Sequence, residues 1–120
     1  MGAGLISEPL HIDLLAKPAV VSGDMSADIA SNPMDVSWHS ELSVQVIWSG
    51  GTSPVGTVTL QGTNDAVADA NWETIDSFSL SGNSGTQMII DSAAAYKHLR
   101  VIYTFTSGVG TMDHILLTAK

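Results

Sequence analysis

The stretch that decides the fold reads Tyr96-Lys-His-Leu-Arg-Val-Ile-Tyr-Thr-Phe-Thr-Ser-Gly-Val-Gly-Thr-Met-Asp-His-Ile-Leu-Leu-Thr-Ala-Lys120. Apolar and β-branched side chains are dense on both sides of Gly108-Val109, which is the pattern of two extended strands with a break between them. Glycine is favoured in the tight turns that join antiparallel strands. We therefore predict a β-hairpin whose turn is centred on Gly108-Val109.

The predicted hairpin has two faces, because successive residues of a strand point to opposite sides. One face is strongly apolar and is predicted to belong to the core: Leu99, Val101, Tyr103, Phe105, Met112 and Leu116. The other face is the candidate interface: Arg100, Ile102, Thr104, Asp113, Ile115 and Leu117. A sheet face in water is normally more polar than this second set, so we expect it to be covered. The cover is either a second layer of the same domain or another subunit.

The two-residue period continues upstream of this stretch. Extended segments are predicted at residues 42–49, 57–61, 72–81 and 87–91, with turn residues between them. In total we predict seven to nine short strands, and hence an all-β, single-domain antiparallel β-sandwich or jelly roll. Residues 42–120 are assigned to the sandwich core. Residues 1–41, interrupted by three prolines, are assigned to an irregular N-terminal arm with edge strands.

The composition excludes several classes of function. The chain has four Lys and Arg residues and twelve Asp and Glu residues, which gives a net charge of −8. It therefore offers few cations to nucleic acid or to an anionic membrane surface. Cysteine is absent, which excludes disulfides and zinc sites with Cys ligands. The first residues carry no basic segment followed by an apolar run, so no signal peptide is predicted and we expect synthesis in a cytoplasm.

The acidic segment from Asn64 to Glu73 is the best metal candidate. Calcium binds several hard oxygen ligands from one short loop, and this loop offers Asp65, Asp69, Asn71 and Glu73. The segment lacks the central glycine and the alternate spacing of an EF-hand loop. A solvated loop in which Asn and Asp cap turns is the favoured alternative, and no cofactor is predicted.

Three tryptophans, Trp38, Trp48 and Trp72, raise the possibility of stacking on sugar rings. Trp48 shares its parity with Val44 and Val46, so we predict that it is buried. Trp72 follows the acidic segment and is the candidate ligand-binding residue. Burial of Trp72 at the start of a strand is the alternative.

The sequence shows no catalytic constellation. No serine lies in a nucleophile-elbow context, and no pair of carboxylates is singled out. The four histidines form no ligand motif, and His114 is predicted to be a hydrogen-bonded core residue beside Tyr103. We therefore predict that the protein is not an enzyme.

Two segments resemble a known group of proteins. The first is Val55-Gly-Thr-Val-Thr-Leu-Gln-Gly-Thr-Asn-Asp65 followed by Trp72, and the second is Tyr96-Lys-His-Leu-Arg-Val-Ile-Tyr-Thr-Phe-Thr-Ser-Gly-Val-Gly-Thr111. Together they resemble small β-sandwich virion proteins of tailed bacteriophages, of the capsid cement or decoration type. The first segment is also similar to discoidin-like and carbohydrate-binding sandwiches.

The resemblance implies a structural role on the virion. The chain would stabilise the capsid shell by binding the major capsid protein or another virion protein through sheet faces and the N-terminal arm. It would assemble in the host bacterial cytoplasm, lie on the capsid surface and form a homo-oligomer, for which we expect a trimer. The alternative is a carbohydrate-binding module of a receptor-binding or adhesion apparatus, with its site at Trp72 and the acidic segment.

Overall fold

The computed structural model describes residues 9–16, 19–65 and 71–120, and all the regular structure in these ranges is β-strand. The strands are β1 (Leu10–Asp13), β2 (Ile29–Ala30), β3 (Met34–Asp35), β4 (Leu42–Thr63), β5 (Glu73–Leu80), β6 (Gly85–Asp91) and β7 (His98–Ala119). All of the pairings between them are antiparallel. The described part of the chain holds no helix that is long and apolar enough to cross a membrane.

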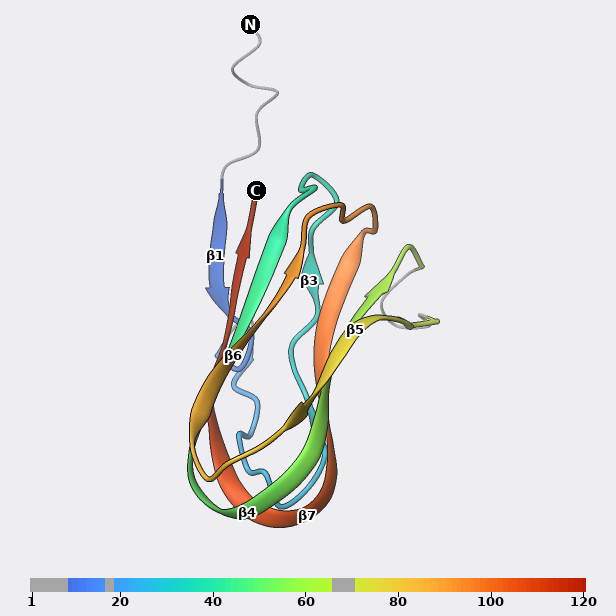
Figure 1. The fold of residues 1–120 in the computed structure, drawn as a ribbon. Helices are drawn as coiled ribbons and strands as arrows, with labels where there is room; N and C mark the ends of the chain where they lie inside the picture. Colours follow the sequence, from blue (N-terminus) through green and yellow to red (C-terminus); the bar gives the residue numbers. More distant parts are fainter. Residues whose placement is uncertain (1–8, 17–18, 66–70) are drawn as a thin grey trace, which may run out of the picture.

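Two long strands form the frame of the molecule. β4 and β7 have 22 residues each and pair with one another from Leu42↔Ala119 to Thr63↔His98. Halfway along, the two strands bend together and fold back, so the ribbon forms a U at the lower end of Figure 1. Each arm of the U becomes the centre of one half of the sheet.

The remaining strands widen the two arms. β6 and β1 flank the first half of β4 and the second half of β7, giving the order β6-β4-β7-β1. β5 flanks the second half of β4, while β2 and β3 flank the first half of β7. Buried side chains from both arms form one core cluster. The predicted all-β antiparallel sandwich is confirmed, and the described residues form seven strands, of which two are long and bent.

The predicted hairpin at Gly108-Val109 is wrong. Residues 98–119 form one strand whose two halves both pair with β4. The predicted break is instead the bend of the ribbon. Left-handed backbone at Gly50 (φ 63°) and Gly108 (φ 84°), together with several register shifts, turns both strands without ending either one.

A separate irregularity reverses the predicted faces near the end of β7. Trp48 pairs with Met112 and Ile47 with His114, so Asp113 is the extra residue of a β-bulge. A bulge moves every following side chain to the opposite face. Ile115 and Leu117, predicted as interface, are 0% and 1% exposed in the core, while Leu116, predicted as core, is half-buried on the outer face.

The described residues before β4 contribute to the same core. Leu14, Met25, Ile29 and Val36 are buried in the central cluster. The buried side chain of Asn32 holds this segment together, because its Nδ2 donates to the carbonyl oxygens of Leu14 (2.8 Å) and Ala19. The described residues before β4, which form only short strands, are thus held in place by the hydrogen bonds of the Asn32 amide and by a few buried apolar side chains.

Candidate functional site

An open cavity of about 560 Å³ lies where three loop segments meet at one end of the sandwich. Its volume is within the range of about 300–1,000 Å³ that is usual for small-molecule sites. The lining comes from the loop after β3, the end of β4 and the loop before β7: Ser37, Trp38, His39, Ser40, Asn64, Ala94, Ala95, Tyr96 and Lys97.

Trp38 is the most unusual residue of this cavity, because 82% of its surface is exposed. Tryptophan is large and apolar and is mostly buried in folded proteins. The turn that presents it is well anchored. Val36 is fully buried, the Asp35 carboxylate accepts hydrogen bonds from the backbone N–H and the hydroxyl of Ser37, and the N–H of His39 donates to the carbonyl of Val36.

Tyr96 is the second aromatic residue that lines the cavity. Its ring packs on the Cα of Gly62, where a Cβ would come within 2.9 Å of the ring. Its hydroxyl donates to Oδ2 of Asp91 at 3.0 Å. Burial and this hydrogen bond raise the pKa of Tyr96, so the hydroxyl remains a donor through the physiological range.

Polar groups complete the cavity. Asn64 is held by its Oδ1, which accepts from the N–H of Lys97 at 3.0 Å, while the same N–H also reaches the carbonyl of Thr63. This leaves the Asn64 amide nitrogen as a donor beside the Lys97 side chain and the hydroxyls of Ser37 and Ser40. The site therefore combines two aromatic surfaces with several hydrogen-bonding groups and is well suited to a polar ring-shaped ligand.

The other two tryptophans have different surroundings. Trp48 is buried as predicted, stacks on Phe78 with ring centroids 6.5 Å apart, and donates its Nε1 hydrogen to the carbonyl of Gly82. Trp72, the ligand-binding residue predicted from the sequence, is half-buried, and the guanidinium of Arg100 lies 4.5 Å from its ring centroid. One face of Trp72 is thus occupied by a residue of the same chain. Sequence reasoning passed over Trp38, although its polar neighbours in a segment without alternation were a usable signal.

The acidic segment is described in part. Asp69 lies outside the described residues. Asn71 donates from its Nδ2 to Oδ2 of Asp65 at 3.1 Å, which is a bond between two side chains, and Glu73 is the exposed first residue of β5. Within the described ranges, no group of three or more His, Asp or Glu is placed to hold a metal ion.

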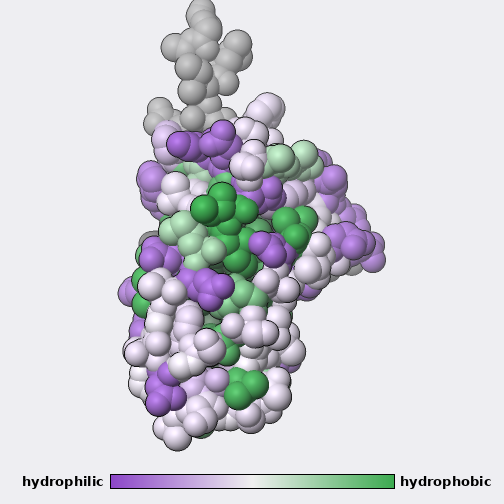
Figure 2. Space-filling model, in the orientation of Figure 1, coloured by the Kyte–Doolittle hydropathy of each residue, from purple (hydrophilic) through white to green (hydrophobic). Residues whose placement is uncertain are grey.

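A second surface feature covers the outer face of the half-sheet β6-β4-β7-β1. Met88 and Ile90 of β6 are 48% and 68% exposed, and half-buried Ile47 and Leu116 lie on the same face of β4 and β7. Figure 2 shows hydrophobic side chains gathered over the upper parts of β4 and β6. We call Ile47, Met88, Ile90 and Leu116 the apolar face.

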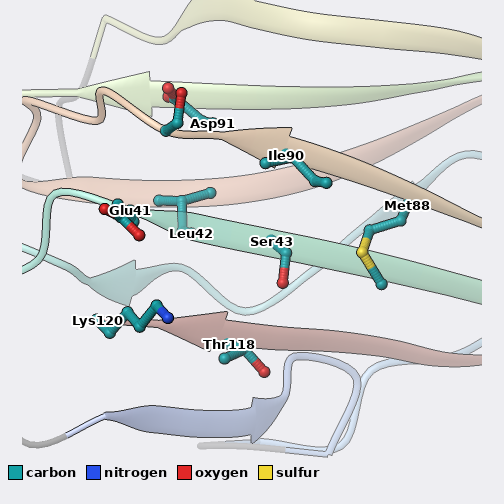
Figure 3. A pocket seen from close by; sticks show the side chains of 9 residues that line it. Glu41, Leu42, Ser43, Met88, Ile90, Asp91, Thr118 and Lys120 are labelled. Atoms are coloured by element: carbon teal, nitrogen blue, oxygen red, sulfur yellow. The ribbon is translucent and has the colours of Figure 1, made fainter.

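A groove of about 220 Å³ is lined by Met88 and Ile90 of this apolar face. In Figure 3, Met88 and Ile90 lie beside Leu42 and Ser43 of β4, with Thr118 and Lys120 from the end of β7 on the other side. Glu41 and Asp91 mark the end of the groove. The groove therefore has an uncharged floor and a charged rim.

The remaining residues of the predicted interface are dispersed. Arg100 donates to Gln61 at 2.8 Å, Ile102 is half-buried and pairs with Ala30 of β2, and Thr104 is exposed. Asp113 is exposed on the arm that carries β6, whereas Arg100, Ile102 and Thr104 lie on the arm that carries β5. Its carboxylate accepts a hydrogen bond from the hydroxyl of Ser49 at 2.6 Å. The six predicted residues do not form one surface, because the hairpin that would have aligned them does not exist.

His114, predicted in the core, lies on the outer face because of the Asp113 bulge. Its Nδ1 is 2.8 Å from Oδ2 of Asp13, which joins β1 to β7. Burial of Asp13 opposes its ionisation. The hydrogen bonds from His114 and from the N–H groups of Leu15 and Ile115 outweigh this effect, and the pKa of Asp13 is lowered.

Comparison with known proteins supports the fold. No protein-family model and no curated protein matches the sequence. Among solved structures, chitosan-binding module 1 from the chitosanase/glucanase of Paenibacillus sp. IK-5 is 15% identical over 96% of this chain and 95% of its own, with a TM-score of 0.54. A cleaved adhesin domain of the Lys-gingipain of Porphyromonas gingivalis is 9% identical over 98% of this chain and 75% of its own, with a TM-score of 0.38. The first likeness shows that the chain has a β-rich fold that is also found in a binding module.

Proposed function

We propose that this chain is a non-catalytic carbohydrate-binding module whose site is the cavity lined by Trp38 and Tyr96. The observation that carries the proposal is an indole 82% exposed on an anchored turn, beside an open cavity with amide, hydroxyl and amine groups. The C–H faces of a sugar ring pack on an aromatic surface while its hydroxyls bond to polar neighbours. The likeness in fold to a chitosan-binding module is consistent with this use.

A cationic polysaccharide is the first ligand to test. The chain carries a net charge of −8, which attracts protonated amino sugars and repels acidic glycans. We expect chito-oligosaccharides with free amines to bind more tightly than their N-acetylated counterparts, and the preference to weaken as salt is raised.

The test is isothermal titration with these oligosaccharides, supported by a glycan array. Trp38→Ala is expected to reduce affinity about tenfold or more, because it removes the stacking surface. Trp72→Ala is the matched control, since it removes a tryptophan whose face is already covered by Arg100. Binding lost in Trp72→Ala but kept in Trp38→Ala would move the site to the position predicted from sequence. The absence of binding to every glycan would refute the proposal.

A virion structural role is the second candidate. The observation that favours it is the apolar face, which is suited to contact with a protein, together with the two segments that resemble capsid cement proteins. In this role the chain would bind the major capsid protein and lie on the capsid surface. Mass spectrometry of purified virions of the encoding phage should find the chain in many copies per particle, and its absence from virions would exclude the role.

A further inference from the structure

The edges of the sheet differ in how they are protected against pairing with another strand. β1 has four residues and follows Pro9, while β2 and β3 have two residues each. β5 carries Glu73 and Asp76 and has a register shift opposite Leu60 and Gln61. Short length, charge and bulges are the usual means by which an edge avoids pairing with other chains.

β6 has none of these protections. It pairs with β4 without a register shift over seven residues, from Leu42↔Asp91 to Trp48↔Gly85. Residues 85–90 carry no charge and no proline. Alternate residues of an edge strand direct their N–H and C=O groups away from the sheet, and no backbone hydrogen bond joins this edge of β6 to another described segment.

We propose that the free edge of β6 pairs with β6 of a second copy of this chain. The pairing is antiparallel about a two-fold axis at Met88, and it joins the two sheets into one. An isologous contact of this kind closes with two subunits, because each edge is used once.

Charge favours this register in spite of the acidity of the chain. Two copies with a net charge of −8 repel one another, so association is favoured where the contact itself brings no like charges together. In the two-fold pairing, Asp91 lies opposite Gly85 of the partner subunit, at the far end from the other Asp91. The two carboxylates are therefore kept apart, and the centre of the contact is uncharged.

The side chains on the outer surface of β6 support the same arrangement. Ile90 is 68% exposed and would lie opposite Thr86 of the partner subunit, while the two Met88 side chains would meet at the axis. Cross-strand pairs of this kind stabilise a sheet. The apolar faces of the two copies then lie side by side in one continuous surface, and the side chains at the join, Met88 and Ile90, lose part of their exposure to water.

The experiment is sedimentation equilibrium of the full chain over a wide range of concentrations. We expect the native chain to form dimers. Met88→Lys and Met88→Glu should each raise the dissociation constant about tenfold or more, because each places like charges opposite one another at the axis. An equimolar mixture of the two variants should recover dimers, since the introduced ammonium group of one copy would then meet the introduced carboxylate of the other.

The control is Ile75→Lys, which introduces a positive charge at an exposed apolar residue of the protected edge strand β5 and should leave the dimer intact. Circular dichroism would confirm that each variant is folded. A native chain that stays monomeric at its highest soluble concentration, a trimer, or a failure of the mixed variants to recover dimers would each overturn the proposal. The Trp38 cavity takes no part in this contact, so loss of dimers and loss of glycan binding are separate outcomes.

Discussion

The two arms of the bent ribbon share the same strands but have different outer faces. On the arm that carries β5, the outward residues of β4 are Thr57, Thr59 and Gln61, which are polar. On the arm that carries β6, the outer face has Ile47, Met88, Ile90 and Leu116. Half-buried Ile102 of β7, which pairs with Thr59, is an aliphatic residue on the first arm, but the second arm carries more aliphatic side chains on its outer face.

One part of the difference, the outward position of Leu116, has a small and local cause. On the first arm Leu99, Val101 and Tyr103 are buried in a regular alternation. On the second arm Met112 is buried, and the bulge at Asp113 then shifts the following residues by one, so Leu117 is buried and Leu116 faces outward. One extra residue therefore decides which leucine stabilises the core and which contributes to the apolar face.

The largest effect is expected from the two neighbouring leucines. Leu117→Ala should lower the free energy of unfolding by about 2–5 kcal/mol, because it removes a fully buried side chain. Leu116→Ala should cost about 1 kcal/mol or less, as is usual for a residue near the surface. Urea denaturation of both variants measures the difference. Equal costs, or a larger cost for Leu116→Ala, would show that the bulge is misplaced.

The bend gives the next largest effect. Gly50 and Gly108 both have positive φ, where a side chain costs about 1–2 kcal/mol. A Cβ at Gly50 would meet nothing within 4 Å, whereas a Cβ at Gly108 would lie 2.2 Å from the carbonyl oxygen of Ser53. We expect Gly108→Ala to be clearly the more destabilising substitution by differential scanning calorimetry. A similar loss for both would mean that β4 and β7 do not pack tightly against one another at the bend.

A smaller effect concerns the attachment of β1 to the second arm. The pKa of Asp13 lies below its ordinary value of 3.8 in the folded protein, so ionised Asp13 stabilises the fold above that pH. This contribution is lost as the pH falls through the lowered pKa. Asp13→Asn should therefore be less stable than the native chain at neutral pH, with the difference shrinking below about pH 4. A difference in stability that is constant with pH would show that the charge of Asp13 contributes nothing. The variant His114→Gln would show how much of the stabilisation comes from His114 and how much from the backbone hydrogen bonds to Leu15 and Ile115.

The smallest effect is expected on the first arm, where Arg100 stacks on Trp72. Arg100→Met should reduce stability by about 0.5–1 kcal/mol, as for other exposed cation–π pairs, and should alter the tryptophan fluorescence. Lys120→Met, at an exposed cation that lines the groove beside Met88 and Ile90 and not the Trp38 cavity, should change neither property. An unchanged emission spectrum in Arg100→Met would show that the pair does not persist in solution.

Much of the fold follows from the sequence. The alternation in residues 42–61 and 98–107, the turn residues and the lack of helical periodicity predict an antiparallel all-β domain, and the parity of Trp48 predicts its burial. The candidate site was harder to find. Trp38 lies in a short turn without periodicity, so its exposure depends on how Val36 and Asp35 anchor that turn.

The sequence by itself thus determines that the fold is all-β, that disulfides and Cys ligands are absent, that the chain is acidic, and at which glycines it can bend. Glycine permits either a turn that ends a strand or a bend that continues it, because both require the same backbone freedom. Tertiary structure decides between them. β4 is long enough to pair with both halves of β7, and this continuous pairing makes residues 98–119 one bent strand, so the faces, the core and the exposed edge of β6 follow from contacts far apart in sequence.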